Sequence, residues 1–141
     1  MNDTIKKFGY PETLLKEYEN WIVMLRPAQV TAGCMVLACK GTATSMADVS
    51  AEAFAELPVV TGELEAALKK TFQMEMINYL CLMMVDKEVH FHVIPRYSEN
   101  REFAGVEFDD PGWAKVPDLG NLIAMTDEQF ASLRKYLMDS W

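Results

Sequence analysis

The chain has 141 residues, 50% hydrophobic and 24% charged, which is enough for one globular domain with its own core over residues 1–141. Its formal net charge is −8, from 13 basic and 21 acidic residues, which argues against general binding to nucleic acid or to anionic membranes. No apolar run approaches the roughly 20 residues that span a bilayer, and no apolar signal-peptide segment follows the first residues.

The cysteines favour a reducing compartment. There are three of them, Cys34, Cys39 and Cys81, an odd number with no Cys-x-x-Cys pair. We therefore expect reduced, structural thiols in a cytoplasmic protein.

The first third of the chain predicts one short helix and two strands. Pro11–Tyr18 reads as a helix, with proline at its first position and an acidic residue in its first turn. Trp21–Leu25 is a continuous apolar run that indicates a central strand. Gly33 then opens a second strand, Cys34–Lys40. Gln29 lies in the loop between them, where binding groups tend to collect.

A long helix and a further strand are expected next. Ser50 is a candidate N-cap for a helix over Ala51–Phe72, whose apolar residues follow the helical period. Pro58 predicts a kink, or a division into two helices, because proline in a helix interior costs about 3 kcal/mol. Met74–Met84 reads as a strand that forms an antiparallel hairpin with the strand after it.

The stretch from Glu88 to Val93 contains both histidines and alternates polar with apolar residues, the period of a half-buried strand. Glu88, His90 and His92 then share one face, which we expect to be exposed at the mouth of a pocket. Pro95 should end the strand pairing, because proline has no N–H to donate. The opposite face is predicted to pack on the core and comprises Val89, Phe91 and Val93.

The remaining chain predicts a loop, a turn at Asp109–Gly112 and a final helix. A capping box over Thr126–Gln129 launches that helix, which places Phe130, Leu133 and Leu137 on one side. Strands grouped separately from helices indicate an α+β fold with a mainly antiparallel sheet.

The histidine-containing strand also resembles a known family. Val89–Arg96 is similar to the motif of the histidine triad (HIT) family, although Glu88 stands where the first triad histidine is expected. The resemblance extends upstream to Asn78–Leu80, and more loosely to Arg26–Gln29. It covers about residues 15–97.

The resemblance implies a HIT-like fold, two protomers joined in a homodimer, and a nucleotide hydrolase or transferase similar to the diadenosine polyphosphate hydrolases. By residue-to-residue transfer, His90 attacks the α-phosphorus of a nucleotide and forms a nucleotidyl-histidine, which water then hydrolyses. His92 holds the phosphate, and the backbone carbonyl of Glu88 steadies the ring of His90. No cofactor is implied. The remaining candidate substrate-binding side chains are Glu88, Asn78, Gln29 and Arg96.

Two departures from the family pattern leave alternatives open. A carboxylate about 4 Å from a phosphate oxygen costs roughly 4 kcal/mol at an effective dielectric of 20. We therefore expect Glu88 to turn toward a cation (Lys87, Arg96 or Arg101), to bind a proton, or to weaken nucleotide binding. Apolar Leu82–Val85 occupies the region where family members carry a polar phosphate contact. The chain could thus be a nucleotide-binding protein with weak or no turnover.

Metal binding through His90 and His92 is the second alternative, since two imidazoles and a carboxylate suit zinc or iron. However, residues i and i+4 of a strand lie about 13 Å apart. Glu88 and His92 therefore cannot share an ion without a bend, and we predict no metal at this row.

Overall fold

The computed structural model describes all residues from 1 to 141 and is an α+β fold, as predicted. Seven strands form two antiparallel sheets: β1 (Leu14–Glu17), β2 (Trp21–Leu25), β3 (Met35–Cys39), β4 (Met76–Leu80), β5 (His90–Arg96), β6 (Arg101–Phe103) and β7 (Val106–Phe108). The helices are α1 (Asp3–Lys7), the 3-10 turn η1 (Met46–Asp48), α2 (Ala51–Phe72) and α3 (Asp127–Met138). None of these helices is both long enough and apolar enough to cross a membrane.

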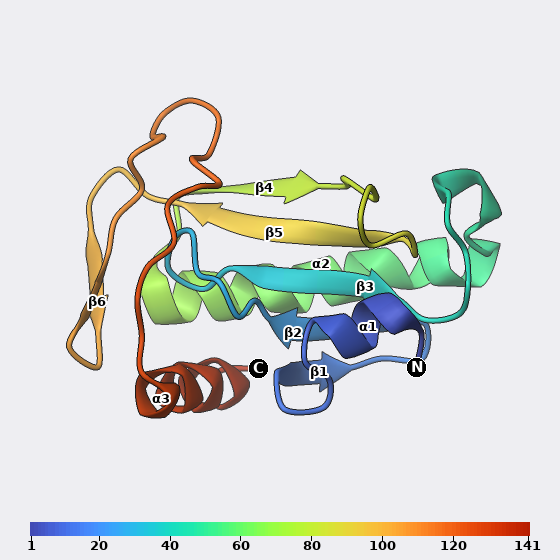
Figure 1. Ribbon diagram of the computed structural model, residues 1–141, viewed down its shortest axis with the longest axis horizontal. Coiled ribbons are helices and arrows are strands. Elements are labelled where there is room, and N and C mark those ends of the chain that lie inside the picture. The colour runs from blue at the N-terminus through green and yellow to red at the C-terminus, as the bar shows by residue number, and fades with distance from the viewer.

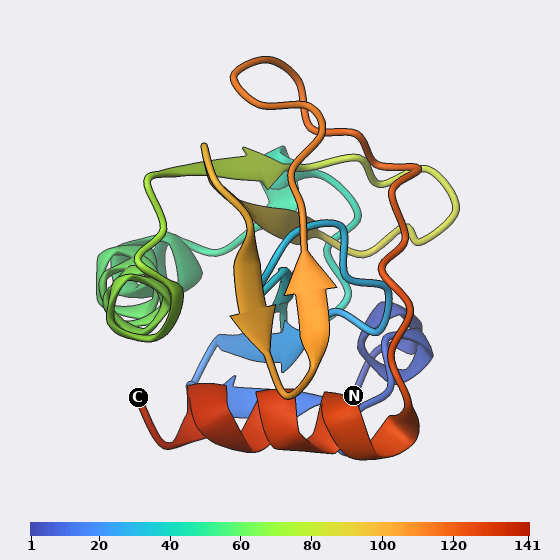
Figure 2. The same cartoon turned by 90° about the vertical axis from the view of Figure 1, so that its left-hand side faces the viewer.

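The main sheet has five strands in the order β1-β2-β3-β5-β4, and all neighbours are antiparallel (Figure 1). Helix α2 covers one face of this sheet and α1 covers part of the other, as the end-on view in Figure 2 shows. Helix α3 lies along the β1 edge, and β6 and β7 form a separate hairpin. The site described below lies on the α1 face.

Alternation along the strands divides the core between these two faces. On the α2 side, Val23, Leu37 and Val93 pack with Leu64 and Leu68 of the helix. On the α1 side the smaller apolar cluster consists of Ile5, Ile22, Met24, Val36 and Ala38. Strands buried on both faces read as continuous apolar runs, which is why β2 and β3 could be recognised from the sequence.

Helix α2 begins and ends where predicted, and the Ser50 side chain accepts a hydrogen bond from the Ala53 N–H. The predicted division at Pro58 does not occur, because one 22-residue helix continues through it. Pro58 and Phe54 are both solvent-exposed, so water can satisfy the Phe54 carbonyl that proline leaves without a donor. The capping box that starts α3 is present as predicted.

The prediction of a helix over Pro11–Tyr18 is wrong. Leu14–Glu17 forms edge strand β1 instead, and the bond from Leu25 N–H to the Thr13 carbonyl extends its pairing with β2. A helix of eight residues is marginal in water. The available partner edge of β2 therefore outweighs the local helical signals.

The strand predicted over Met74–Met84 is shorter, Met76–Leu80, and residues 81–89 form a loop that joins it to β5. Pro95 does not end the pairing with β4, which continues to Arg96. In an antiparallel strand the bonding direction alternates. The Arg96 carbonyl accepts a hydrogen bond from the Glu75 N–H on the β4 side, so the backbone nitrogen of Pro95 points to the opposite side. The pairing of β3 with β5 stops at Val93, so no strand on that side needs a hydrogen bond from Pro95.

Candidate active site

His90 opens β5, and its ring is held by a backbone hydrogen bond. Nδ1 lies 2.8 Å from the carbonyl oxygen of Glu88, the contact that the resemblance implies. A carbonyl can only accept, so Nδ1 carries a proton, and in the neutral ring Nε2 then keeps its lone pair. Nε2 has no hydrogen-bond partner in the protein, and it keeps some exposure to solvent. The residue is 2% exposed, and that small exposure therefore includes Nε2.

His92 lies on the same face, with its ring centroid 5.2 Å from that of His90. Burial lowers the pKa of His92 to about 4, and the neighbouring guanidinium of Arg26 and ring of His90 act in the same direction. The imidazole is therefore neutral at pH 7. Its Nδ1 is buried without a partner. A proton there would lack an acceptor, which favours the form with the proton on Nε2, a hydrogen-bond donor toward the open side.

Phe8 covers both histidines. Its ring centroid lies 5.6 Å from that of His90 and 5.7 Å from that of His92. The expectation that the histidine row is exposed is therefore wrong for His90. The physical reason is α1, which folds onto this face of the sheet and carries Phe8 at its C-terminal end. The shared face of the two histidines, and the packing of Val89 and Val93 on the opposite core, follow the prediction.

Glu88 precedes β5 instead of lying within it. Its carboxylate accepts a 2.9 Å hydrogen bond from the Thr4 hydroxyl, and this bond is the main reason that the pKa of Glu88 is lowered. Two expectations are therefore corrected: the side chain binds no proton, and it pairs with neither Lys87 nor an arginine. Glu88, Thr4 and the Lys7–Asp86 ion pair line a cavity of about 580 Å³ beside α1.

Gln29 is a structural residue, which corrects its predicted substrate-binding role. It is fully buried, and its amide nitrogen donates to the carbonyls of Arg26 and Cys34. Its amide oxygen accepts from the backbone of Gly33 and Cys34. All of its bonding capacity therefore holds the loop between β2 and β3, and none remains for a ligand. In the same loop Gly33 has φ +83°, and a Cβ there would meet Leu68 at 2.6 Å.

Arg96 has a structural role, and it also lines a cavity together with Asn78. Its Nε and Nη2 bond both carboxylate oxygens of Asp110, at 2.8 and 3.1 Å, and the pair is almost fully buried. Its Nη1 donates to Asn78 and to the Lys115 carbonyl. Arg96 thus anchors the segment after β7 onto the sheet. Asn78 lies on the same sheet face as His92, and it pairs with Ile94, two residues after His92 on β5. Asn78 also lines a cavity of about 770 Å³ with Trp113.

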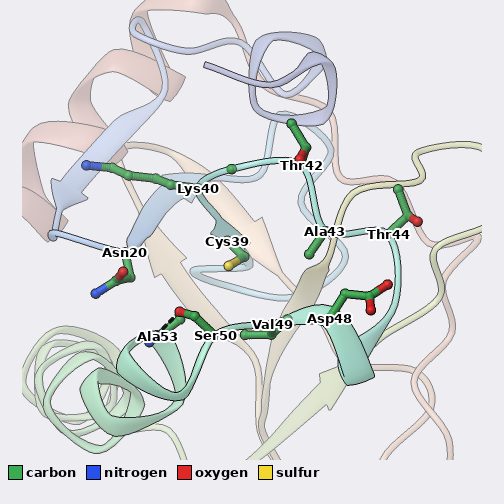
Figure 3. A pocket seen from close by; sticks show the side chains of 11 residues that line it. Asn20, Cys39, Lys40, Thr42, Ala43, Thr44, Asp48, Val49, Ser50 and Ala53 are labelled. Carbon is green, nitrogen blue, oxygen red and sulfur yellow. Dashed lines mark hydrogen bonds between the residues drawn. The ribbon is translucent and has the colours of Figure 1, made fainter.

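A further cavity of about 440 Å³ lies where β3 ends and α2 begins, and Figure 3 shows it from close by. Its lining includes Asn20, Cys39, Lys40, Thr42 and Asp48. Neither histidine lines it. This cavity is therefore separate from the histidine site.

Three residues at the site were missed by the sequence reasoning: Thr4, Phe8 and Arg26. Asn2 caps α1 by accepting from the Ile5 N–H, and an Asn-Asp start is a recognisable helix signal. That signal could have found the helix but not the face that it covers. No group of three or more His, Cys, Asp or Glu side chains is placed to hold a metal ion.

No protein-family model matches the sequence, and no curated protein matches it significantly. Solved structures do. A histidine triad protein from Sinorhizobium meliloti matches with a TM-score of 0.72 and 18% identity over 100% of this chain and 96% of that one. A hypothetical histidine triad nucleotide-binding protein from Sulfolobus tokodaii matches with a TM-score of 0.70 and 17% identity, over 97% and 88% of the two chains.

A zinc-bound histidine triad family protein from Mycobacterium smegmatis matches with a TM-score of 0.60 and 18% identity, over 96% of this chain and 90% of that one. At these identities the likeness establishes the fold. The chain has the fold of histidine triad proteins, with the His90–His92 pair on the sheet face opposite α2.

Proposed function

We propose that this protein binds a nucleotide and cleaves it at the α-phosphorus through a covalent intermediate on His90. One observation carries the proposal: the bond of 2.8 Å between His90 Nδ1 and the Glu88 carbonyl. In the neutral ring this bond leaves the lone pair on Nε2, and it fixes the ring, which are the two conditions for an imidazole nucleophile. The likeness to histidine triad structures, one of them described as nucleotide-binding, supports the same chemistry.

In the first step the Nε2 lone pair of His90 forms a bond to the α-phosphorus, and the bond from phosphorus to the leaving group breaks. In the second step water forms a new phosphorus–oxygen bond and loses a proton to the solvent, and the phosphorus–nitrogen bond breaks, which releases a nucleoside monophosphate and restores the Nε2 lone pair of His90. The Nε2–H of neutral His92 donates to a phosphate oxygen or to the bridging atom of the leaving group. Asn78, on the same face, is proposed as a further ligand contact.

The proposed substrates share an α-phosphorus and differ in the leaving group: dinucleoside polyphosphates, as in the diadenosine polyphosphate hydrolase branch, nucleoside phosphoramidates and aminoacyl adenylates. The test is a panel of these three classes with wild type and His90→Ala, followed by intact-mass analysis after a rapid quench. We expect an adduct of one nucleotidyl group on wild type and none on the variant. Full activity in His90→Ala would overturn the mechanism.

A second candidate is a nucleotide-binding protein without turnover. The burial of His90 under Phe8 favours it, because a nucleophile that is 2% exposed reaches phosphorus only if α1 shifts. Binding of a nucleoside monophosphate without any adduct or product from the panel would support this function instead.

We further propose that the protein is a cytoplasmic homodimer. The three cysteines are free, which suits a reducing compartment. Strand β4 is a sheet edge, and Met76 on it is 62% exposed, so this edge is available to a second copy. Light scattering of the purified protein tests the dimer, and a monomer at micromolar concentration would contradict it.

A further inference from the structure

The proposed site needs a local positive charge that neither histidine supplies. His92 is neutral at pH 7, because burial, Arg26 and His90 lower its pKa to about 4. The chain as a whole carries −8, and an ionised Glu88 lies close to His90. A phosphate ester would therefore be repelled at long range and must be held by a cation within the site.

Arg26 is placed to supply that cation. It follows β2 directly, and its N–H donates to the Cys34 carbonyl at 2.9 Å, which continues the ladder with β3. Met24, Val36 and His92 form one row across the three strands, so Arg26 stands in the next row. Alternation places its side chain on the histidine face. The influence of its charge on His92 is consistent with this proximity.

The guanidinium of Arg26 has one occupied edge and one empty edge. Its Nη1 donates to the carbonyl of Ala28. Its Nε is buried and has no partner, and Nη2 has no partner in the protein but is not buried. Nε–H and Nη2–H point in the same direction and form the fork that matches two oxygens of a carboxylate or phosphate.

Arg96 of the same chain shows what this edge does when it is filled. There Nε and Nη2 bind the two oxygens of Asp110, while Nη1 donates to Asn78 and to the Lys115 carbonyl. Arg26 also uses Nη1 for a contact within the protein, with the Ala28 carbonyl, but no anion occupies its Nε–Nη2 edge. A buried donor without an acceptor costs free energy, and such a group is expected where a ligand supplies the acceptor.

We propose that Arg26 binds the phosphate of the substrate through the Nε–Nη2 edge of its guanidinium, next to His92. This inference rests on the proposed function and names its charged contact. Arg26 takes the place of the polar phosphate contacts that the apolar Leu82–Val85 segment lacks. Neutral His92 adds one donor from Nε2, so phosphate oxygens bridge the two side chains.

The test is calorimetric titration of three proteins at fixed salt: wild type, Arg26→Gln and Arg26→Lys. Each protein is titrated with adenosine and guanosine monophosphates, with the two corresponding nucleosides, and with pyrophosphate. Arg26→Gln should weaken monophosphate binding about 10- to 100-fold, the loss expected for a charged bidentate contact. Nucleoside binding should stay the same. Arg26→Lys keeps the charge without the fork and should fall in between. Lys70→Gln, which removes an exposed charge on α2 across the sheet, is the matched control and should match wild type.

NMR titration of His92 provides an independent readout, because its pKa should rise in Arg26→Gln if the guanidinium lies beside it. If Arg26→Gln fails to fold, Arg26→Lys carries the test. Equal monophosphate affinity in the Arg26 variants and wild type would overturn the role of Arg26 and leave the proposed function standing. If wild type binds no nucleotide, the proposed function fails. Binding of pyrophosphate that depends on Arg26 would in that case still support an anion site at Arg26. If wild type binds neither nucleotide nor pyrophosphate, both the proposed function and the role of Arg26 are overturned.

Discussion

The carboxylate of Glu88 accepts a hydrogen bond of 2.9 Å from the hydroxyl of Thr4, a residue 84 positions earlier in the chain. This bond ties α1 to the segment that leads into β5, and the Lys7–Asp86 ion pair ties the same two segments a second time. Where the family pattern has an imidazole, this chain therefore has a tether for the helix that covers His90.

We predict that Glu88→Ala and Thr4→Val each lower the free energy of unfolding by about 1 kcal/mol, the usual value of one hydrogen bond. The double variant should cost little more than the larger single change, because both remove the same bond. Urea unfolding of the four proteins checks this. Additive losses would show that the two side chains act independently.

Glu88→His should raise kcat/KM for nucleotide cleavage, or tighten monophosphate binding, by at least about tenfold, since about 1.4 kcal/mol corresponds to one decade. It removes a negative charge two residues before His90, the proposed nucleophile. Glu88→Gln should recover part of the gain, because it removes the charge without adding an imidazole. Loss of rate in both variants would mean instead that the carboxylate acts as an acid or base in the reaction.

Phe8→Ala should expose His90. Diethyl pyrocarbonate modifies unprotonated imidazole, so the variant should react faster at His90 than wild type, as located by tandem mass spectrometry. The lost packing should also lower the free energy of unfolding by about 2 kcal/mol, less than for a fully buried phenylalanine. Phe54→Ala, on α2 across the sheet, is the control. An unchanged rate at His90 would show that other groups shield it.

The depressed pKa of His92, about 4, predicts a pH-dependent stability. Because the folded value lies below the unfolded value near 6.5, the unfolded chain binds the extra proton more tightly between the two. Stability should therefore fall as the pH drops from about 6.5 toward 4. The loss should be about 1–2 kcal/mol after allowance for partial solvent exposure. Urea unfolding at pH 7, 6 and 5 tests it, and His92→Asn should flatten the slope over this window.

Asp110→Ala should destabilise the fold by about 3–5 kcal/mol, because it leaves the buried guanidinium of Arg96 without its counter-ion. The matched control is Lys135→Gln, which breaks an exposed ion pair with Asp139 on α3 and should change stability by less than about 0.5 kcal/mol. Thermal or urea unfolding separates the two cases. A small effect of Asp110→Ala would mean that water replaces the carboxylate.

Elements defined by local patterns could be predicted from the sequence alone. The period of two around His90 and His92 placed both imidazoles on one strand face, and the caps at Ser50 and Thr126 marked where α2 and α3 begin. These features depend on residues within a few positions of one another, so the sequence contains the information directly.

Only the tertiary structure decided which polar side chains remain free for a ligand. Gln29 and Arg96 looked like binding residues, but the backbone around Cys34 and the carboxylate of Asp110 occupy them. Phe8 and Thr4 reach the site from the other end of the chain. Such contacts join segments far apart in sequence. No local pattern specifies which segments meet when the sheet forms, and the meeting is driven by non-directional burial of apolar surface.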